Sequence, residues 1–224
     1  RVISFTGSVG VAKQIMVHAG IKKLAFELGG NAATFIDASA NMEYAAKRCA
    51  MGAFINSGQV CISLQRIYVH EAVYETFTQR LVKEANALKM GSPYDEATFI
   101  GPLVNEAAVE KATRWIQSAL KEGARVACGN VVDGLLMAPT VMVDVEESMN
   151  IMCEEVFAPI VSLVKVRDYE EAKERTNASH YGLQYSIFTN DLAMSMRAID
   201  ELEAGGIVVN DIPTLRFDLQ PYGG

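Results

Sequence analysis

Ile160–Val166 (IVSLVKV) is followed by Tyr169–Asn177 (YEEAKERTN) and by Tyr185–Thr189 (YSIFT), and this succession indicates the fold class. The first and third segments are short runs rich in β-branched and aromatic residues, which is typical of strands. The polar segment between them has the length and composition of a surface helix. Alternation of this kind favours strands that lie parallel and are joined by helical crossovers.

The same alternation continues along the rest of the chain. The sequence also predicts strands at Val2–Phe5, Leu24–Glu27, Ala33–Ile36, Ile67–His70, Ala124–Cys128, Thr140–Val143 and Ile207–Asn210, and helices up to about His18, from the N-cap Asn41 to Phe54, from Glu71 to about Leu88, from about Glu106 to Glu122, and over Leu192–Leu202. The predicted fold class is α/β, a doubly wound, mostly parallel sheet with helices on both faces. Ligands in such folds bind at the carboxyl ends of strands, where we expect the site.

Composition excludes several classes of protein. The chain has 224 residues, 50% of them hydrophobic, which is enough for a globular core, and its net charge of −7 argues against a nucleic-acid partner. No apolar run is long enough for a membrane segment. Cys49, Cys61, Cys128 and Cys153 form no CxxC pair, and we expect no metal site, reduced thiols and a cytoplasmic location.

The ends of the sequence resemble the interior of a protein. Arg1–Phe5 reads as part of a strand without an initiator methionine, and Pro221–Gly224 is turn material. We therefore expect this chain to be a piece of a longer polypeptide.

Cys61 lies in the polar, glycine-containing stretch Asn56–Cys61 (NSGQVC). A nucleophilic thiol needs an accessible polar setting of this kind, in which Asn56 offers a hydrogen-bonding group. The alternative is a buried structural thiol, which is our interpretation of Cys49 within its helix. From the spacing alone, both readings of Cys61 stay open.

Three further segments carry groups suited to catalysis or binding. Glu27 ends a predicted strand and precedes two glycines, where a carboxylate can act as a general base or simply form a cap or ion pair. Glu155 could accept hydrogen bonds from a ribose diol while Phe157 packs on a flat ring; a helix-terminal acid and a core Phe are the alternative. Gly7 and Ser8 lie at a strand–helix junction that can meet a phosphate, although the GxGxxG pattern is absent.

Taken in order, these motifs resemble the aldehyde dehydrogenase superfamily along essentially the whole chain. The motifs are FTGS at 5–8, ELGG at 27–30, GQVC at 58–61, GP at 101–102, PT at 139–140, EEVFAP at 154–159, YGL at 181–183 and PYGG at 221–224. Ala158 stands where the family more commonly has glycine. The resemblance implies NAD- or NADP-dependent oxidation of a small-molecule aldehyde to a carboxylic acid.

The resemblance also implies the chemical roles. Cys61 would attack the aldehyde to give a thiohemiacetal, with its backbone N–H as half of an oxyanion hole, and hydride would pass to the nicotinamide. Glu27 would activate the water that hydrolyses the resulting thioester. Two alternatives are an acylating enzyme that uses coenzyme A, which lacks such a glutamate, and a non-catalytic family member, which often lacks the cysteine.

Binding roles follow from the same resemblance. Gly7, Ser8 and Leu28 would contact the coenzyme, Glu155 would hold the nicotinamide ribose, and Phe157 would lie beside the nicotinamide ring.

The stretch ending at Arg216 looks like those of enzymes acting on lactaldehyde, glyceraldehyde-3-phosphate or phosphonoacetaldehyde. Arg216 could grip an anionic or hydroxylated tail, or it could be bridged to Asp211 or Asp218 as a structural arginine. Asn56 and Ile62 would also lie at the aldehyde site, and the bulk of Ile62 would favour short aldehydes.

By the same comparison, residues 1–30 correspond to the end of a coenzyme-binding domain and residues 31–224 to a catalytic domain. The family's upstream half and its C-terminal oligomerisation strand have no counterpart here. We expect the chain alone to have little or no dehydrogenase activity, and the full-length protein to be a homodimer or homotetramer.

Overall fold

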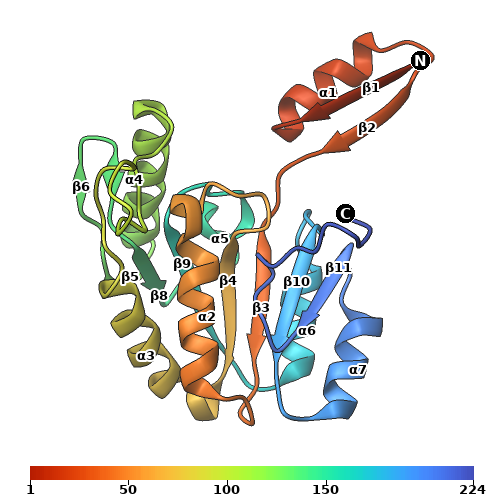
Figure 1. Ribbon diagram of the computed structural model, residues 1–224. Coiled ribbons are helices and arrows are strands. Elements are labelled where there is room, and N and C mark those ends of the chain that lie inside the picture. Colours follow the sequence, from red (N-terminus) through yellow and green to blue (C-terminus); the bar gives the residue numbers. More distant parts are fainter.

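A seven-stranded sheet forms the centre of the molecule, which the computed structural model describes over residues 1–224 (Figure 1). Neighbouring strands are parallel except at one edge, where β5 runs antiparallel to β8. The mostly parallel sheet predicted from the sequence is confirmed. From edge to edge the strands are β11 (Gly206–Val209), β10 (Gln184–Phe188), β3 (Ala32–Ile36), β4 (Leu64–His70), β9 (Ile160–Val166), β8 (Thr140–Val143) and β5 (Arg125–Cys128).

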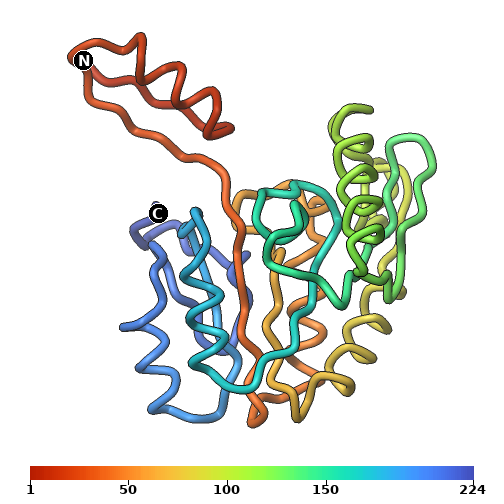
Figure 2. Tube along the Cα trace, turned by 180° about the vertical axis from the view of Figure 1, so that it is seen from behind, coloured from red at the N-terminus to blue at the C-terminus, as the bar shows by residue number.

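Helices cover both faces of this sheet, as predicted. One layer contains α2 (Met42–Phe54) and α3 (Tyr74–Asn86), and the other contains α4 (Glu106–Lys121), α5 (Asn150–Cys153), α6 (Tyr169–Asn177) and α7 (Leu192–Glu201). Figure 2, turned by 180°, brings the second layer to the front. Side chains of β4 alternate between the two cores, with Tyr68 in one and Ile67 and Val69 in the other.

The helices begin where side chains satisfy their free N–H groups. The predicted N-cap is confirmed, because the side-chain oxygen of Asn41 accepts a hydrogen bond from the Tyr44 N–H at 3.1 Å. Asn105 caps α4 in the same way, and Asp168 and Asp191 cap α6 and α7. These caps explain why the starts of the helices were readable from the sequence.

Three elements depart from the sequence-based expectation. Strand β4 starts at Leu64 rather than Ile67, because Gln65 and Arg66 are buried and hydrogen-bonded inside the fold. The predicted helix from Glu71 begins with a short 3-10 turn, Glu71–Val73, before α3. A small hairpin, β6 (Val132–Asp133) with β7 (Leu136–Met137), lies between the predicted strands that end at Cys128 and begin at Thr140.

A separate β-α-β unit precedes the large sheet and projects from it (Figure 1). It consists of β1 (Val2–Thr6), α1 (Val9–His18) and β2 (Lys23–Glu27), with the two strands parallel. The connection Leu28–Asn31 joins the carboxyl end of β2 directly to the amino end of β3. The carboxyl edge of the small unit therefore faces the amino edge of the large sheet.

Gly58 makes one of the close backbone approaches near this edge. Its φ is +71°, and a Cβ atom there would lie 2.2 Å from the carbonyl oxygen of Ala158. Gly134 has a similar φ of +59° but no atom within 4 Å of such a Cβ. Substitution of each glycine by alanine therefore distinguishes the cost of backbone strain, present at both positions, from the cost of a steric clash, present only at Gly58.

We predict that Gly58→Ala lowers the free energy of unfolding by about 3 kcal/mol or more, since strain and overpacking add. Gly134→Ala, which introduces strain alone, is expected to cost about 1 kcal/mol. Urea denaturation of both variants measures the difference. Equal losses would show that the contact between Gly58 and Ala158 is not as close as described.

Candidate active site

Cys61 and Glu27 line one cavity of about 390 Å³ between the small unit and the large sheet. Glu27 is the last residue of β2, and Cys61 lies in the turn just before β4. The complete lining is Thr6, Glu27, Cys61, Arg216, Gln220 and Tyr222. The structure thus brings together three of the residues singled out in the sequence: Glu27, Cys61 and Arg216.

The location of this cavity corrects one expectation. It does lie at the carboxyl ends of β1 and β2, but it faces the amino ends of β3 and β4 in the large sheet. The expectation of a site at the carboxyl ends of the strands is therefore wrong for the seven-stranded sheet. The physical reason is the head-to-tail connection of β2 to β3, which turns opposite edges of the two sheets toward each other.

The turn that carries Cys61 is held in an unusual backbone conformation. Asn56, Ser57 and Gly58 have consecutive positive φ values of 50°, 57° and 71°. Two non-glycine residues in the left-handed region are held there only by surrounding contacts, and such conformations are common at functional sites. The Ser57 hydroxyl donates to the Gly101 carbonyl at 2.8 Å, and the Gln59 side chain accepts from the Val104 N–H at 2.9 Å.

Tyr222 contacts the sulfur of Cys61, with 3.2 Å between Oη and Sγ. Burial raises the pKa of Tyr222 above its ordinary value, and the hydrogen bond to Cys61 and the charges of Cys61 and Glu27 raise it further. The phenol therefore stays protonated at neutral pH and can donate to the sulfur. The sequence offered no signal for this contact, since Tyr222 was noted only within the terminal turn and the PYGG motif at 221–224.

Arg216 is free of ion pairs. Its guanidinium carbon lies 4.5 Å from the centre of the Tyr222 ring, a cation–π contact, and no carboxylate is within 4.0 Å. Asp211, one of the two alternative partners, instead pairs with Arg48 at 2.6 Å. The arrangement leaves the charge of Arg216 at the cavity wall, where its role in substrate binding remains a prediction.

Glu155 is half-buried, and a backbone N–H group binds its carboxylate. Its Oε1 accepts a hydrogen bond from the Gly30 N–H at 2.9 Å, while no protein group donates to Oε2. Burial raises the pKa of the Glu155 carboxyl, and the Gly30 hydrogen bond and the nearby Lys111 charge partly offset this. A Cβ atom on Gly29 would lie 2.6 Å from Oε2, so a larger residue at this position would collide with the Glu155 carboxylate as it now lies.

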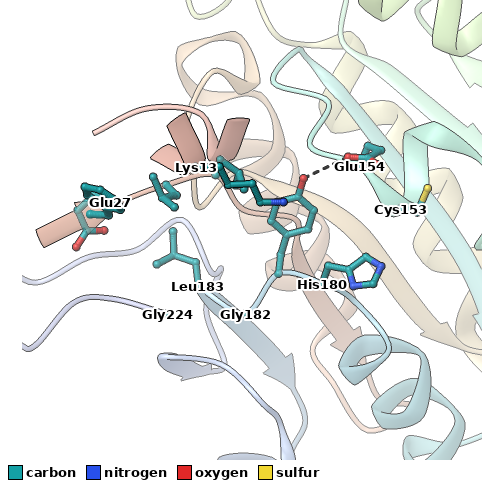
Figure 3. A pocket seen from close by; sticks show the side chains of 13 residues that line it. Lys13, Glu27, Cys153, Glu154, His180, Gly182, Leu183 and Gly224 are labelled. Carbon is teal, nitrogen blue, oxygen red and sulfur yellow. Dashed lines mark hydrogen bonds between the residues drawn. The ribbon is translucent and has the colours of Figure 1, made fainter. Parts of the chain in front are cut away.

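A larger cleft of about 750 Å³ adjoins the first cavity and shares Glu27 with it (Figure 3). Lys13 of α1, Leu28 and Gly29 line one part, and residues from later in the chain, including Glu154 and Tyr181, line the other. Glu27 lies at the end of the cleft away from Cys153 and His180. The cleft is suited to an elongated ligand that reaches from α1 toward Cys61.

Four of the predicted coenzyme residues line neither cavity: Gly7, Ser8, Glu155 and Phe157. Ser8 caps α1 by accepting from the Val11 N–H at 3.4 Å, and Gly7 donates its N–H to the Glu27 carbonyl at 3.0 Å. Phe157 is exposed, with a positive φ of 54°. Their coenzyme roles are predictions that this geometry does not test.

Two predicted substrate residues are not on the cavity wall. Ile62 is buried, with 4% of its surface exposed, and the Asn56 side chain donates to the Gln59 carbonyl at 3.1 Å. Neither position has been tested as a substrate contact.

No group of three or more His, Cys, Asp or Glu side chains is placed to hold a metal ion. Among the helices, none combines the length and apolar character needed to cross a membrane. All four cysteines are free.

Comparison with known proteins gives one consistent family. The model of the aldehyde dehydrogenase family matches residues 1–224. A 3-sulfolactaldehyde dehydrogenase from Priestia aryabhattai is 40% identical over the whole chain, which covers 47% of that protein. A lactaldehyde dehydrogenase from Methanococcus maripaludis is also 40% identical over the whole chain, which covers 48% of it.

A solved structure shares the fold over the whole length of this chain. The glyceraldehyde-3-phosphate dehydrogenase of Methanocaldococcus jannaschii, solved in complex with NADP, superposes with a TM-score of 0.97 and 36% identity, over all of this chain and 48% of that one. The chain spans about half the length of the curated relatives it matches.

The burial of Glu155 predicts how its replacement changes stability with pH. Its folded pKa lies above the ordinary 4.5, so the stability it contributes is fully present below about pH 4.5 and is lost as the pH rises through the raised value. Glu155→Gln removes the buried charge but keeps an acceptor for Gly30. We therefore predict that this variant gains stability over the parent as the pH rises from about 4.5 to 8.

Urea unfolding at several pH values, with the exposed Glu154→Gln as control, measures the effect. A Glu155→Gln variant that loses stability relative to the parent as the pH rises would contradict the raised pKa.

Proposed function

This chain belongs to the aldehyde dehydrogenase family, and we propose that its protein oxidises a short aldehyde to a carboxylic acid with NAD or NADP as the acceptor. The observation that carries the proposal is the shared cavity, in which a cysteine and a carboxylate from separate parts of the fold face the same space. A nucleophile and a general base in one site are what a covalent oxidation followed by hydrolysis requires.

In the first stage the Cys61 sulfur, as thiolate, forms a bond to the aldehyde carbon, and the carbonyl oxygen becomes an oxyanion. The backbone N–H of Cys61 is the proposed donor to that oxygen. The Tyr222 hydroxyl, 3.2 Å from the sulfur, stabilises the thiolate before attack.

In the second stage the thioester on Cys61 is hydrolysed. Glu27 takes a proton from water, the water oxygen bonds to the thioester carbon, and the carbon–sulfur bond breaks to release the acid and the Cys61 thiolate. The position of Glu27 on the same cavity wall supports this role.

The residues present fit a dinucleotide coenzyme. Glu155 keeps one carboxylate oxygen free of protein donors, Gly29 leaves that oxygen room, and Lys13 places a cation in the adjoining cleft. Glu155 is the proposed ligand of the ribose hydroxyls, with Leu28 and Phe157 nearby and Gly7 and Ser8 toward the phosphates. When bound, the nicotinamide accepts the hydride that leaves the substrate carbon. The solved relative with NADP supports this class of coenzyme.

The proposed substrate is a short aldehyde with a hydroxylated or anionic tail. Arg216 has its charge unpaired at the cavity, and a guanidinium binds carboxylate, sulfonate or phosphate through two donors. The relatives are named for lactaldehyde, 3-sulfolactaldehyde and glyceraldehyde-3-phosphate, all hydroxylated and two of them anionic.

The remaining features of the whole protein are also proposals. We infer a homodimer or homotetramer, a cytoplasmic location, and a division into a coenzyme-binding part, residues 1–30, and a catalytic part, residues 31–224. The presence of Glu27 disfavours the acylating alternative, and a partly exposed Cys61 in the cavity disfavours a non-catalytic role.

Turnover and burst kinetics of the full gene product that contains residues 1–224 test the proposal. We predict that Cys61→Ser lowers kcat by about a thousandfold or more, whereas Glu27→Gln still releases one equivalent of reduced coenzyme per site and then slows by about a hundredfold. Residues 1–224 alone should show little or no turnover. A Cys61→Ser variant with near-normal activity would exclude the mechanism.

Substrate selection is tested by Arg216→Leu. Loss of a charge-assisted contact should raise KM for 3-sulfolactaldehyde or phosphonoacetaldehyde by about tenfold or more while leaving propanal within about twofold. Lactaldehyde, measured with NAD and with NADP, separates the hydroxyl from the anionic group. Equal changes for charged and uncharged aldehydes would remove Arg216 from substrate recognition.

A further inference from the structure

We propose that Gln65 is a positioning residue for Glu155, fixing the backbone on both sides of that carboxylate so that its free oxygen keeps its orientation toward the coenzyme. This inference rests on the proposed function for its consequence in binding. The contacts that support it are independent of any coenzyme.

The side chain of Gln65 is buried, with 5% of its surface exposed, and it forms three hydrogen bonds to one stretch of backbone. Its Nε2 donates to the carbonyls of Glu154 at 2.6 Å and Ile151 at 3.2 Å. Its Oε1 accepts from the Val156 N–H at 3.0 Å. The residues before and after Glu155 are therefore both bound to the same amide group.

This stretch is not paired with a neighbouring strand, and side chains supply much of its support. Residues 154–159 lie between α5 and β9 and belong to no helix or strand. Buried backbone N–H and carbonyl groups need hydrogen-bond partners. In a sheet a neighbouring strand supplies them, and here the side chain of Gln65 does so. Removing the Gln65 amide leaves the Glu154 carbonyl and the Val156 N–H without these bonds, so the segment is free to shift.

A β-bulge in β4 orients the side chain of Gln65 toward this segment. Ala32 pairs with Leu64 and Ala33 with Arg66, so Gln65 is an extra residue in the ladder, a β-bulge. Bulges re-aim side chains and are frequent beside active sites. Because of the bulge, Gln65 and Arg66 both reach groups on the same side of the sheet.

Arg66 secures the other half of the same contact. Its guanidinium donates twice to the Asn31 carbonyl, at 3.0 and 3.3 Å, and Asn31 directly follows the Gly30 whose N–H binds Glu155. Two consecutive residues of β4 thus hold the acceptor segment and the donor segment of the bond between Gly30 and Glu155. Gln65 is the member that holds the residues on either side of Glu155, whose own carbonyl accepts a hydrogen bond from Lys111 Nζ at 3.0 Å.

The chemistry of the position requires an amide. Two carbonyls and one N–H must be satisfied together, which needs both a donor and an acceptor on one side chain. Methionine matches the length of glutamine but has neither group in adequate strength. Glutamate keeps the acceptor for Val156 but presents a carboxylate to two carbonyls.

Gln184 provides a matched control. It is also a buried glutamine, 7% exposed, whose Nε2 donates to a backbone carbonyl, that of Leu215, at 2.6 Å. Gln184→Met therefore removes a comparable buried hydrogen bond from a different loop, on the substrate side. It should alter neither the Gly30–Glu155 contact nor coenzyme affinity.

The experiment uses the full gene product with Gln65→Met, Gln65→Glu and Gln184→Met. Hydrogen exchange of the Gly30 amide, which Gln65 does not touch, reports whether Glu155 stays in place. Coenzyme Kd is measured by titration with NAD and NADP in the absence of aldehyde. We expect Gln65→Met to speed Gly30 exchange and raise Kd by about tenfold each, and to raise the coenzyme KM with kcat at saturation changed by less than about threefold.

Gln65→Glu should change both quantities in the same direction, because its carboxylate keeps the acceptor for the Val156 N–H but faces two carbonyl oxygens, and it serves if the methionine variant does not fold. Gln184→Met should leave Gly30 exchange and coenzyme Kd within about twofold of the parent. Normal Gly30 exchange in both Gln65 variants would overturn the proposal. If the parent binds neither coenzyme, the proposed function fails, while Gly30 exchange still decides the positioning role.

Discussion

The contact of Gly30 with the carbonyl of Cys61 is the constraint on which the candidate site depends. A Cβ atom at Gly30 would lie 2.0 Å from that oxygen, so the two segments meet at a distance that only glycine allows. The same residue donates its N–H to Glu155, and it lies three positions after Glu27. One glycine thus sets the separation of the proposed nucleophile, base and coenzyme ligand, because each is attached to it by a short stretch of chain or a single hydrogen bond.

Next to this contact lies the buried guanidinium of Arg66, whose direct partners are polar groups and aromatic rings rather than carboxylates. Arg66 is 2% exposed and forms no ion pair; it donates to the Asn31 carbonyl and the Tyr68 hydroxyl and lies within 6 Å of the Tyr68 and Tyr185 rings. Tyr68 in turn donates to Glu147, whose pKa is raised by burial. Removing the side chain of Arg66, Tyr68 or Glu147 would leave a buried polar group unpaired. The network therefore restricts the movement of the segment that contains Gly30.

The sequence predicted the elements whose signals are local. The bounds of β8, β9 and α6 were correct because an apolar run or a cap marks each end, as Asp168 does for α6. It could not show that β4 begins at Leu64, since Gln65 and Arg66 read as polar until their tertiary partners are known. Tyr222 and the amino-edge location of the site escaped for the same reason: both arise from segments that meet only in the folded chain.

We infer that Cys61 is the reactive thiol, accessible in the cavity, and that the other three cysteines are structural. Burial raises the pKa of Cys49, Cys128 and Cys153, which lowers their reactivity at neutral pH. The most direct test follows iodoacetamide labelling of all four by peptide mass spectrometry at about pH 7.5. We predict that Cys61 is modified about ten times faster than any other cysteine. Labelling of Cys128 or Cys153 at the rate of Cys61 would contradict it.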